Sequence, residues 1–165
     1  MGKRVTGVIF MLSIIILGLL GCTTPRGEAA QEQSQPEAYF LVFEDMYNQD
    51  TVLNGDIKYI SLDIEKAELQ DKKGLIELFK GFCDKNGFTL LIDNYEGLIE
   101  KGYIKDMYFE DGIIIKYEDV ALKDNKLVTN VSKWRSGKGA IGGKYTLEKK
   151  DGKWKIISGG VQWIS

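Results

Sequence analysis

The stretch that decides the fold is residues 108–165, which read YFEDGIIIKYEDVALKDNKLVTNVSKWRSGKGAIGGKYTLEKKDGKWKIISGGVQWIS. Short runs rich in β-branched and aromatic residues alternate there with turn residues. This pattern predicts extended strands joined by tight turns, and therefore an antiparallel meander in the C-terminal third. The four expected strands are 113–117, 127–134, 145–149 and 154–164, the last bent or bulged at Gly159-Gly160, with turns at 110–112, 123–126 and 150–152.

Two core-facing helices are predicted upstream of the meander. The first follows Pro36, which suits the first turn of a helix, and runs to about Asn48 with an aromatic stripe at helical spacing. The second is expected from Asp71, as N-cap, to about Lys85. The remaining expected elements are strands at 57–64 and 88–92, and a brief helix from Asp93 or Asn94 through Lys101.

Helices first and strands last are typical of an α+β fold, in which N-terminal helices pack on a curved antiparallel sheet. The order resembles the NTF2-like or cystatin-like cone over about residues 37–164. The strand expected at 57–64 departs from that resemblance, because the cone usually has no strand between its first two helices. The ending Gly152-Lys153-Trp154-Lys155-Ile156, with Trp163-Ile164-Ser165, is also similar to small uncharacterised lipoproteins of Gram-positive bacteria, which implies a lineage and no activity.

The N-terminus predicts export and lipid attachment. Two basic residues, Lys3 and Arg4, precede the 16 uncharged residues 5–20, which lead into Leu19-Leu20-Gly21-Cys22. The uncharged run is short for a membrane span and fits a signal peptide, although an uncleaved membrane anchor is the alternative. The ending resembles the lipobox of bacterial lipoproteins, which implies cleavage before Cys22, lipidation of Cys22, and a cell-membrane location on the extracytoplasmic face. We expect a signal peptide at 1–21, a flexible polar tether at 22–35, and one α+β domain at 36–165.

Composition excludes several function classes. Without the leader the chain has 20 basic and 24 acidic residues, a formal charge of −4, which argues against a nucleic-acid partner. The chain has no histidine, so it lacks the commonest metal ligand and the commonest general base, and we expect no metal and no cofactor. Cys83 falls on the apolar stripe of the second helix and is expected to be a buried, unreactive thiol.

A glycine-rich segment, Gly137-Lys138-Gly139-Ala140-Ile141-Gly142, matches the dinucleotide-binding pattern G-x-G-x-x-G. That motif needs a strand before it and a helix after it, whereas strands are predicted on both sides here. We interpret it as a wide turn with a β-bulge, and Gly159-Gly160 as a second bend or bulge. Lys133, Arg135 and Lys138 surround Trp134, which is either a site for an anionic or aromatic group or a solvated turn.

The sequence carries no catalytic constellation, and we expect a non-catalytic domain that binds a small ligand or an envelope protein. The candidate contact residues are Tyr117, Trp134, Arg135 and Trp163. One alternative is an envelope enzyme that uses carboxylates or Cys83, and another is an immunity or structural lipoprotein. Three aspartates near predicted strand ends, Asp56, Asp63 and Asp93, either converge in a pocket or serve as turn and cap residues.

Overall fold

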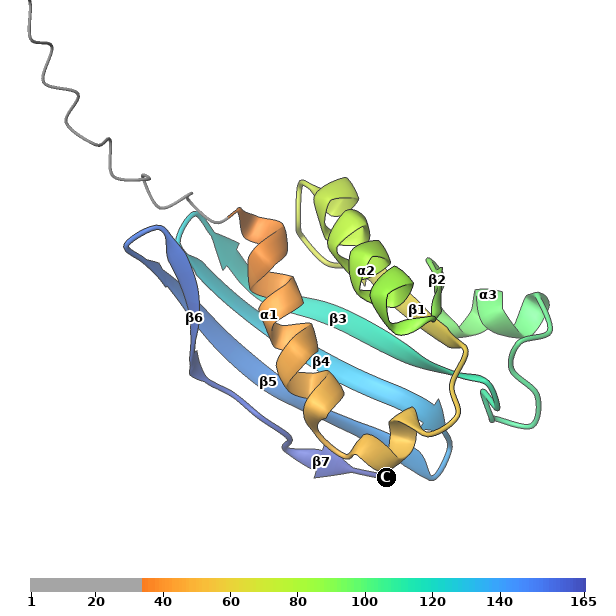
Figure 1. Ribbon diagram of the computed structural model, residues 1–165. Helices are drawn as coiled ribbons and strands as arrows, with labels where there is room; N and C mark the ends of the chain where they lie inside the picture. Colours follow the sequence, from red (N-terminus) through yellow and green to blue (C-terminus); the bar gives the residue numbers. More distant parts are fainter. Residues whose placement is uncertain (1–33) are drawn as a thin grey trace, which may run out of the picture.

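The computed structural model describes residues 34–165, so the leader, Cys22 and the tether up to residue 33 lie outside the described residues (Figure 1). Three α-helices, one 3-10 helix and seven strands follow one another along this part of the chain. They are α1 (Gln35–Asn48), η1 (Thr51–Asn54), β1 (Tyr59–Lys66), α2 (Lys72–Asn86), β2 (Thr89–Leu91), α3 (Tyr95–Glu100), β3 (Gly112–Lys123), β4 (Lys126–Ser136), β5 (Gly139–Lys150), β6 (Lys153–Ser158) and β7 (Trp163–Ile164).

The strands form one mixed sheet in the order β2-β1-β3-β4-β5-β6, and β7 pairs with β5. The strands β3 to β6 make the predicted antiparallel meander, whereas β1 pairs in parallel with both β2 and β3. Figure 1 shows α1 and α2 lying across one face of this curved sheet, which confirms the α+β class. The strand between the first two helices, β1, is an inner strand of the sheet because it pairs with β2 on one side and with β3 on the other. The helix α2 is the crossover that joins β1 to the parallel strand β2.

The domain begins slightly earlier than the sequence predicts. The tether was expected to extend through Gln35, but α1 starts at Gln35 and Ser34 is its N-cap. The Glu37 carboxylate accepts hydrogen bonds from the Ser34 backbone N–H and, at 3.1 Å, from the Ser34 hydroxyl. Indole Nε1 of Trp154 also donates to the Ser34 carbonyl oxygen at 2.8 Å. The start of α1 cannot be distinguished from the tether by its polar composition, since a capping box is itself made of polar residues.

The second helix matches its predicted signals. The Asp71 carboxylate accepts a hydrogen bond from the Gly74 backbone N–H at 2.8 Å, and Gly87 follows the last turn in the left-handed conformation. The apolar stripe of α2 packs against that of α1, where the ring centroids of Phe43 and Phe79 lie 4.4 Å apart. Local signals sufficed here, because caps and periodicity act within one turn of the helix.

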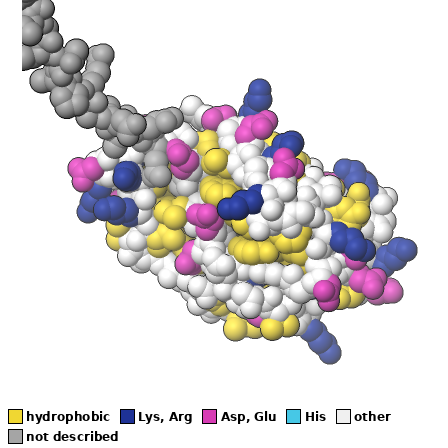
Figure 2. Space-filling view, in the orientation of Figure 1, with side chains coloured by type: hydrophobic (Ala, Val, Ile, Leu, Met, Phe, Trp, Pro, Cys, Tyr) yellow, Lys and Arg dark blue, Asp and Glu magenta, His cyan; other side chains and the backbone are white. Residues whose placement is uncertain are grey.

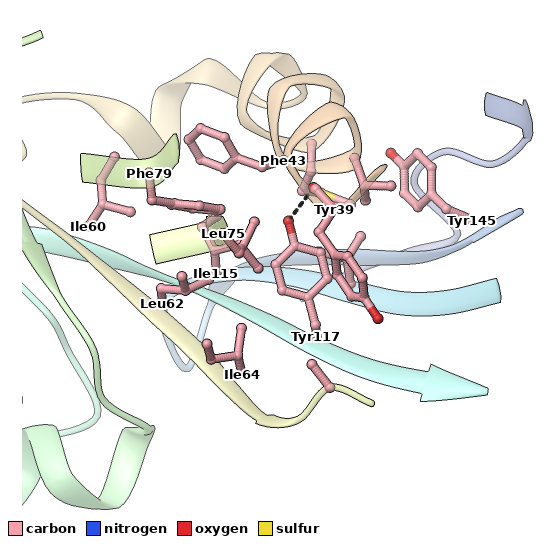
Figure 3. Close-up of a cluster of buried hydrophobic side chains, with 14 of the residues drawn as sticks. Tyr39, Phe43, Ile60, Leu62, Ile64, Leu75, Phe79, Ile115, Tyr117 and Tyr145 are labelled. Carbon is pink, nitrogen blue, oxygen red and sulfur yellow. Dashed lines mark hydrogen bonds between the residues drawn. The ribbon is translucent and has the colours of Figure 1, made fainter. Parts of the chain in front are cut away.

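The main core lies between the two helices and the sheet, and Figure 3 shows its aromatic and aliphatic side chains converging there. Tyr39, Phe43, Tyr117 and Tyr145 are all fully buried. Each fully buried side chain of this size contributes about 1.5–3 kcal/mol to folding. This packing fills the helix side of the sheet, while on the outer surface of that side acidic and basic side chains lie among small apolar patches (Figure 2).

The glycine-rich segment differs from the wide turn expected there. The turn between β4 and β5 is tight, and Gly139 to Gly142 belong to β5. The expected bulge is present as a register shift between Trp134 and Ser136. The turn predicted at residues 110–112 also differs from the hairpin turn that the sequence indicates. These residues lead into β3, and the segment just before them forms isolated bridges at Tyr108 and no strand. No helix within residues 34–165 is long and apolar enough to span a membrane.

Candidate binding groove on the open face of the sheet

A row of five residues crosses the sheet on the face away from α1 and α2. Strand pairing places Asp63 opposite Lys116, Lys116 opposite Ser132, Ser132 opposite Gly142, and Gly142 opposite Trp163. Directly paired residues point to the same face of a sheet, and this row alternates with core residues such as Leu62, which is fully buried. The row therefore belongs to the side that the two long helices leave uncovered.

This face is hollowed into two adjoining pockets, which together we call the groove. The first is lined by Lys116, Glu118, Asn130, Val131, Ser132, Gly143, Gln162 and Trp163, and has a volume of about 330 Å³. The second is lined by Asp63, Tyr95, Glu96, Ile114, Lys116, Ser132 and Trp134, and has a volume of about 340 Å³. Lys116 and Ser132 line both. Each pocket is at the small end of the range for ligand sites, roughly 300–1,000 Å³.

The short helix α3 walls one end of the groove. Asn94 caps it by accepting a hydrogen bond from the Gly97 backbone N–H at 2.9 Å. The buried Ser61 hydroxyl, on the open face of β1, donates to the Asp93 carbonyl oxygen at 2.9 Å. These contacts hold Tyr95 beside Trp134, with ring centroids 5.0 Å apart and planes at 88°. The end of the groove is thus an aromatic corner fixed by the backbone around it.

Trp163 closes the opposite end. Its indole covers Gly142, so that a Cβ atom at that position would collide with the ring. Likewise, a side chain at Gly143 would collide with the carbonyl group of Gly160 in the segment before β7. These two glycines therefore permit the C-terminal segment to approach the backbone of β5 closely. Trp163 remains 47% exposed and available for contact.

Asp63 is the most deeply placed carboxylate of the groove. Its side chain is only 7% exposed. Within the described residues it accepts one hydrogen bond, from the Glu65 backbone N–H at 3.2 Å, and it forms no ion pair. Burial raises the pKa of Asp63 above its ordinary value, opposed by that hydrogen bond and by the charge of Lys116. A buried carboxylate with so few partners is costly for folding.

The lysine in the middle of the groove is already paired. Lys116 Nζ lies 3.0 Å from a Glu118 carboxylate oxygen, which Lys66 Nζ also approaches to 3.0 Å. Hydrogen bonds from these two lysines lower the pKa of Glu118 below its ordinary value. Three carboxylates line the groove, those of Asp63, Glu96 and Glu118, against the single cation of Lys116. Because Lys66 and Lys116 both pair with Glu118, the excess negative charge lies at the end of the groove that Asp63 and Glu96 line.

Two of the four predicted contact residues, Trp134 and Trp163, lie in this groove, at its opposite ends. Tyr117 lies on the other face of the sheet, fully buried, and its hydroxyl donates to the Tyr39 carbonyl oxygen at 2.8 Å (Figure 3). It presents no surface to a ligand. The alternation of side chains across β3 and β4 separates residues that the sequence places close together.

Arg135 lies on the helix side and holds the backbone around η1. Its guanidinium donates to the carbonyl oxygens of Leu53 at 3.1 Å, Gly55 at 2.6 Å and Glu110 at 2.7 Å. The Arg135 guanidinium also lies over the Tyr108 ring, 5.8 Å from its centroid. These contacts occupy the side chain within the fold, so Arg135 and Trp134 do not form a joint surface.

Lys133 is fully buried and binds the C-terminal end of α1. Its Nζ donates to the carbonyl oxygens of Tyr47 at 3.2 Å, Asp50 at 3.1 Å and Gln49, and to Oδ1 of Asn54 at 3.0 Å. Burial lowers the pKa of Lys133 to about 8, while the charge of Asp50 opposes this shift. The cation stabilises carbonyl groups that a helix end leaves without partners. The cluster expected around Trp134 thus divides into two structural cations, Lys133 and Arg135, one groove residue, Trp134, and Lys138, which is exposed in the turn between β4 and β5.

Cys83 is buried, as predicted, at 1% exposed. Burial raises the pKa of its thiol to about 11, which keeps it protonated at neutral pH. Among residues 34–165, no three acidic or cysteine side chains are grouped in a way that would hold a metal ion. The alternative of an envelope enzyme that uses Cys83 gains no support from this arrangement.

From the sequence, Asp63 is a candidate site residue only as one of three aspartates near predicted strand ends. The groove residues Lys116, Ser132 and Tyr95 are not predicted from the sequence. Asp63 and Asp93 do line a common hollow beside the groove, whereas Asp56 is a turn residue with a φ of 54°. The available signal was an isolated charge within the apolar run of β1, since such a residue at a half-buried position needs a specific reason.

The chain matches no protein-family model, no curated protein and no solved structure.

Proposed function

We propose that this protein is a membrane-tethered, non-catalytic domain that binds a small polar ligand in the groove on the open face of its sheet. The observation that carries the proposal is the joining of two ligand-sized pockets through Lys116 and Ser132, with an aromatic residue at each end. Ligand sites commonly combine aromatic walls with a few convergent polar groups. The buried helix side of the sheet offers no comparable arrangement of accessible groups at Tyr117 and Lys133.

The cellular setting belongs to the same proposal and rests on the sequence. Residues 1–21 would act as a lipoprotein signal peptide, Cys22 would carry the lipid, and the polar segment after it would tether the domain outside the cytoplasmic membrane. Two or more acyl chains give stable attachment where one is marginal. The groove would then face extracytoplasmic ligands, with the membrane as the partner of the lipid alone.

Lipid attachment is tested by metabolic labelling of bacterial cells with a palmitate analogue. We expect the wild-type chain to incorporate the label and Cys22→Ala to lose it, because Cys22 provides the only acceptor thiol at the lipobox. Cys83→Ala is the matched control and should keep the label, since this thiol is buried in the folded domain. Label that persists in Cys22→Ala would show that the chain is not lipidated there.

The groove is tested by equilibrium dialysis of the protein against a small-molecule extract of the source cells, followed by mass spectrometry. The wild-type protein should retain at least one compound, and Ser132→Tyr should retain about tenfold less of it, because the new ring fills the floor shared by both pockets. Val120→Tyr is the control, since Val120 is 53% exposed and lies outside the groove. Equal retention by wild type and Ser132→Tyr would exclude the groove as the binding site.

A further inference from the structure

We propose that the Asp63 end of the groove is a site for an organic ammonium group, which would sit against Tyr95 and Trp134 and pair with the Asp63 carboxylate. This inference rests on the proposed function, because it names the class of ligand that the groove takes. It is carried by three independent observations, which concern the aromatic corner, the balance of charge and the bonding of Asp63.

The aromatic corner suits a cation. The faces of tryptophan and tyrosine rings attract cations, and indole is the strongest of these surfaces. Tyr95 and Trp134 meet nearly at right angles, at 88°, so they form two adjoining walls of the pocket lined also by Ile114. Both rings are partly exposed and are held by the buried Ser61 contact and the cap of α3. An alkylammonium group can contact apolar and aromatic surface with its methyl or methylene groups while its charge is stabilised by the rings.

The charges around the pocket favour the same ligand. Asp63 and Glu96 line it directly, and its only cation, Lys116, is paired with Glu118 at 3.0 Å. An anionic ligand would meet two carboxylates with no free cation opposite them among the lining residues. A neutral ligand would leave the buried charge of Asp63 with the Glu65 backbone N–H as its one hydrogen-bond donor among the described residues, which is unfavourable in a partly desolvated site.

The bonding of Asp63 leaves room for one strong donor. With one hydrogen bond from Glu65 and no ion pair within the described residues, this 7% exposed carboxylate retains capacity for an N⁺–H donor or a close ammonium. Burial raises its pKa, and a bound cation would reverse that effect by stabilising the charged form. The adjoining pocket, with Asn130, Ser132 and Gln162, would hydrogen-bond the uncharged part of a longer ligand.

The test compares choline with 3,3-dimethyl-1-butanol, its neutral isostere, by isothermal titration of the full chain in a non-ionic detergent. We expect choline to bind at least about tenfold more tightly than the alcohol, and Asp63→Asn to remove most of that difference. Asp124→Asn, which neutralises an exposed carboxylate in the turn between β3 and β4, is the matched control and should bind choline as the wild type does.

The outcomes separate this inference from the proposed function. Equal affinity of the wild type for choline and the alcohol, or no binding of choline, would overturn the ammonium site even if dialysis shows a ligand that Ser132→Tyr loses. Tight choline binding that is unchanged in Asp63→Asn would place the cation elsewhere and overturn it as well. The comparison of the two probes on wild-type protein holds whether or not Asp63→Asn is stable.

Discussion

Replacing Lys133 with methionine is expected to lower the free energy of unfolding by about 3 kcal/mol, because it removes a buried ammonium group that donates to four oxygen atoms at the end of α1. Methionine keeps most of the side-chain length and removes the ammonium group. The Gln49 carbonyl oxygen and the Asn54 amide oxygen lose the donor Lys133 Nζ, whereas the carbonyl oxygens of Tyr47 and Asp50 keep hydrogen bonds from Asn54 Nδ2 at 2.7 Å and from the Leu53 N–H at 3.2 Å. The loss would loosen the end of α1 and the segment that leads to η1. Urea unfolding followed by circular dichroism measures the effect.

Lys138→Met provides the control for Lys133→Met. Lys138 lies in the exposed turn between β4 and β5, only a few residues away, so its replacement changes the same charge without a buried contact. Surface substitutions of this kind usually change stability by less than about 0.5 kcal/mol. A Lys133→Met variant as stable as Lys138→Met would mean that the bonds of Lys133 to the end of α1 contribute nothing to folding.

The domain is expected to lose stability steeply above about pH 10.5, by up to about 4 kcal/mol per pH unit. Tyr39, Tyr117 and Tyr145 are fully buried, and burial raises the pKa of each well above its ordinary value of 10.0. Bonds to Asp119 and Asp45 raise the pKa values of Tyr39 and Tyr145 further. Above pH 10 the unfolded chain releases these protons while the folded domain retains them, so the stabilisation present below pH 10 is lost as the pH rises.

The titration of Lys133 changes the free energy of unfolding in the opposite direction over part of this pH range. Its pKa falls from 10.5 to about 8 on folding, so between these values the unfolded chain holds the extra proton and stability rises with pH. The buried thiol of Cys83, with its pKa raised from 9.0 to about 11, instead lowers stability between those two values. Because Lys133 offsets part of the tyrosine effect up to its unfolded pKa, the net loss should become steep only above about pH 10.5.

The measurement is urea unfolding at several alkaline pH values, with tyrosinate absorbance recorded in parallel. Tyr145→Phe should reduce the slope of stability against pH above about pH 10.5 by about one third, since it removes one of the three buried tyrosine hydroxyl groups. Tyr108→Phe, at a 43% exposed tyrosine, should leave the slope as in the wild type. A slope that is the same in all three proteins would show that these buried hydroxyl groups do not control alkaline unfolding.

Local signals predicted the helices and most strands because each signal acts within a few residues. Asp71 and Gly87 limit α2 in the structure as the sequence indicates. The segment at residues 139–142 is harder to predict, because Gly142 is required by the indole of Trp163 and not by a wide turn. The parallel pairing of β1 with β3 was also not predictable, since no local pattern specifies which distant strand becomes a neighbour.

By itself the sequence determined the α+β class, the meander, the caps of α2 and the burial of Cys83, because periodicity and turn chemistry are local properties. Only the tertiary structure decided which charged and aromatic residues share a surface. Strand alternation sends Lys133 and Arg135 to one face and Trp134 to the other, and pairing across three strands brings Asp63, Lys116 and Ser132 into one row. Neighbours across a sheet are set by register, and register depends on how the whole core packs.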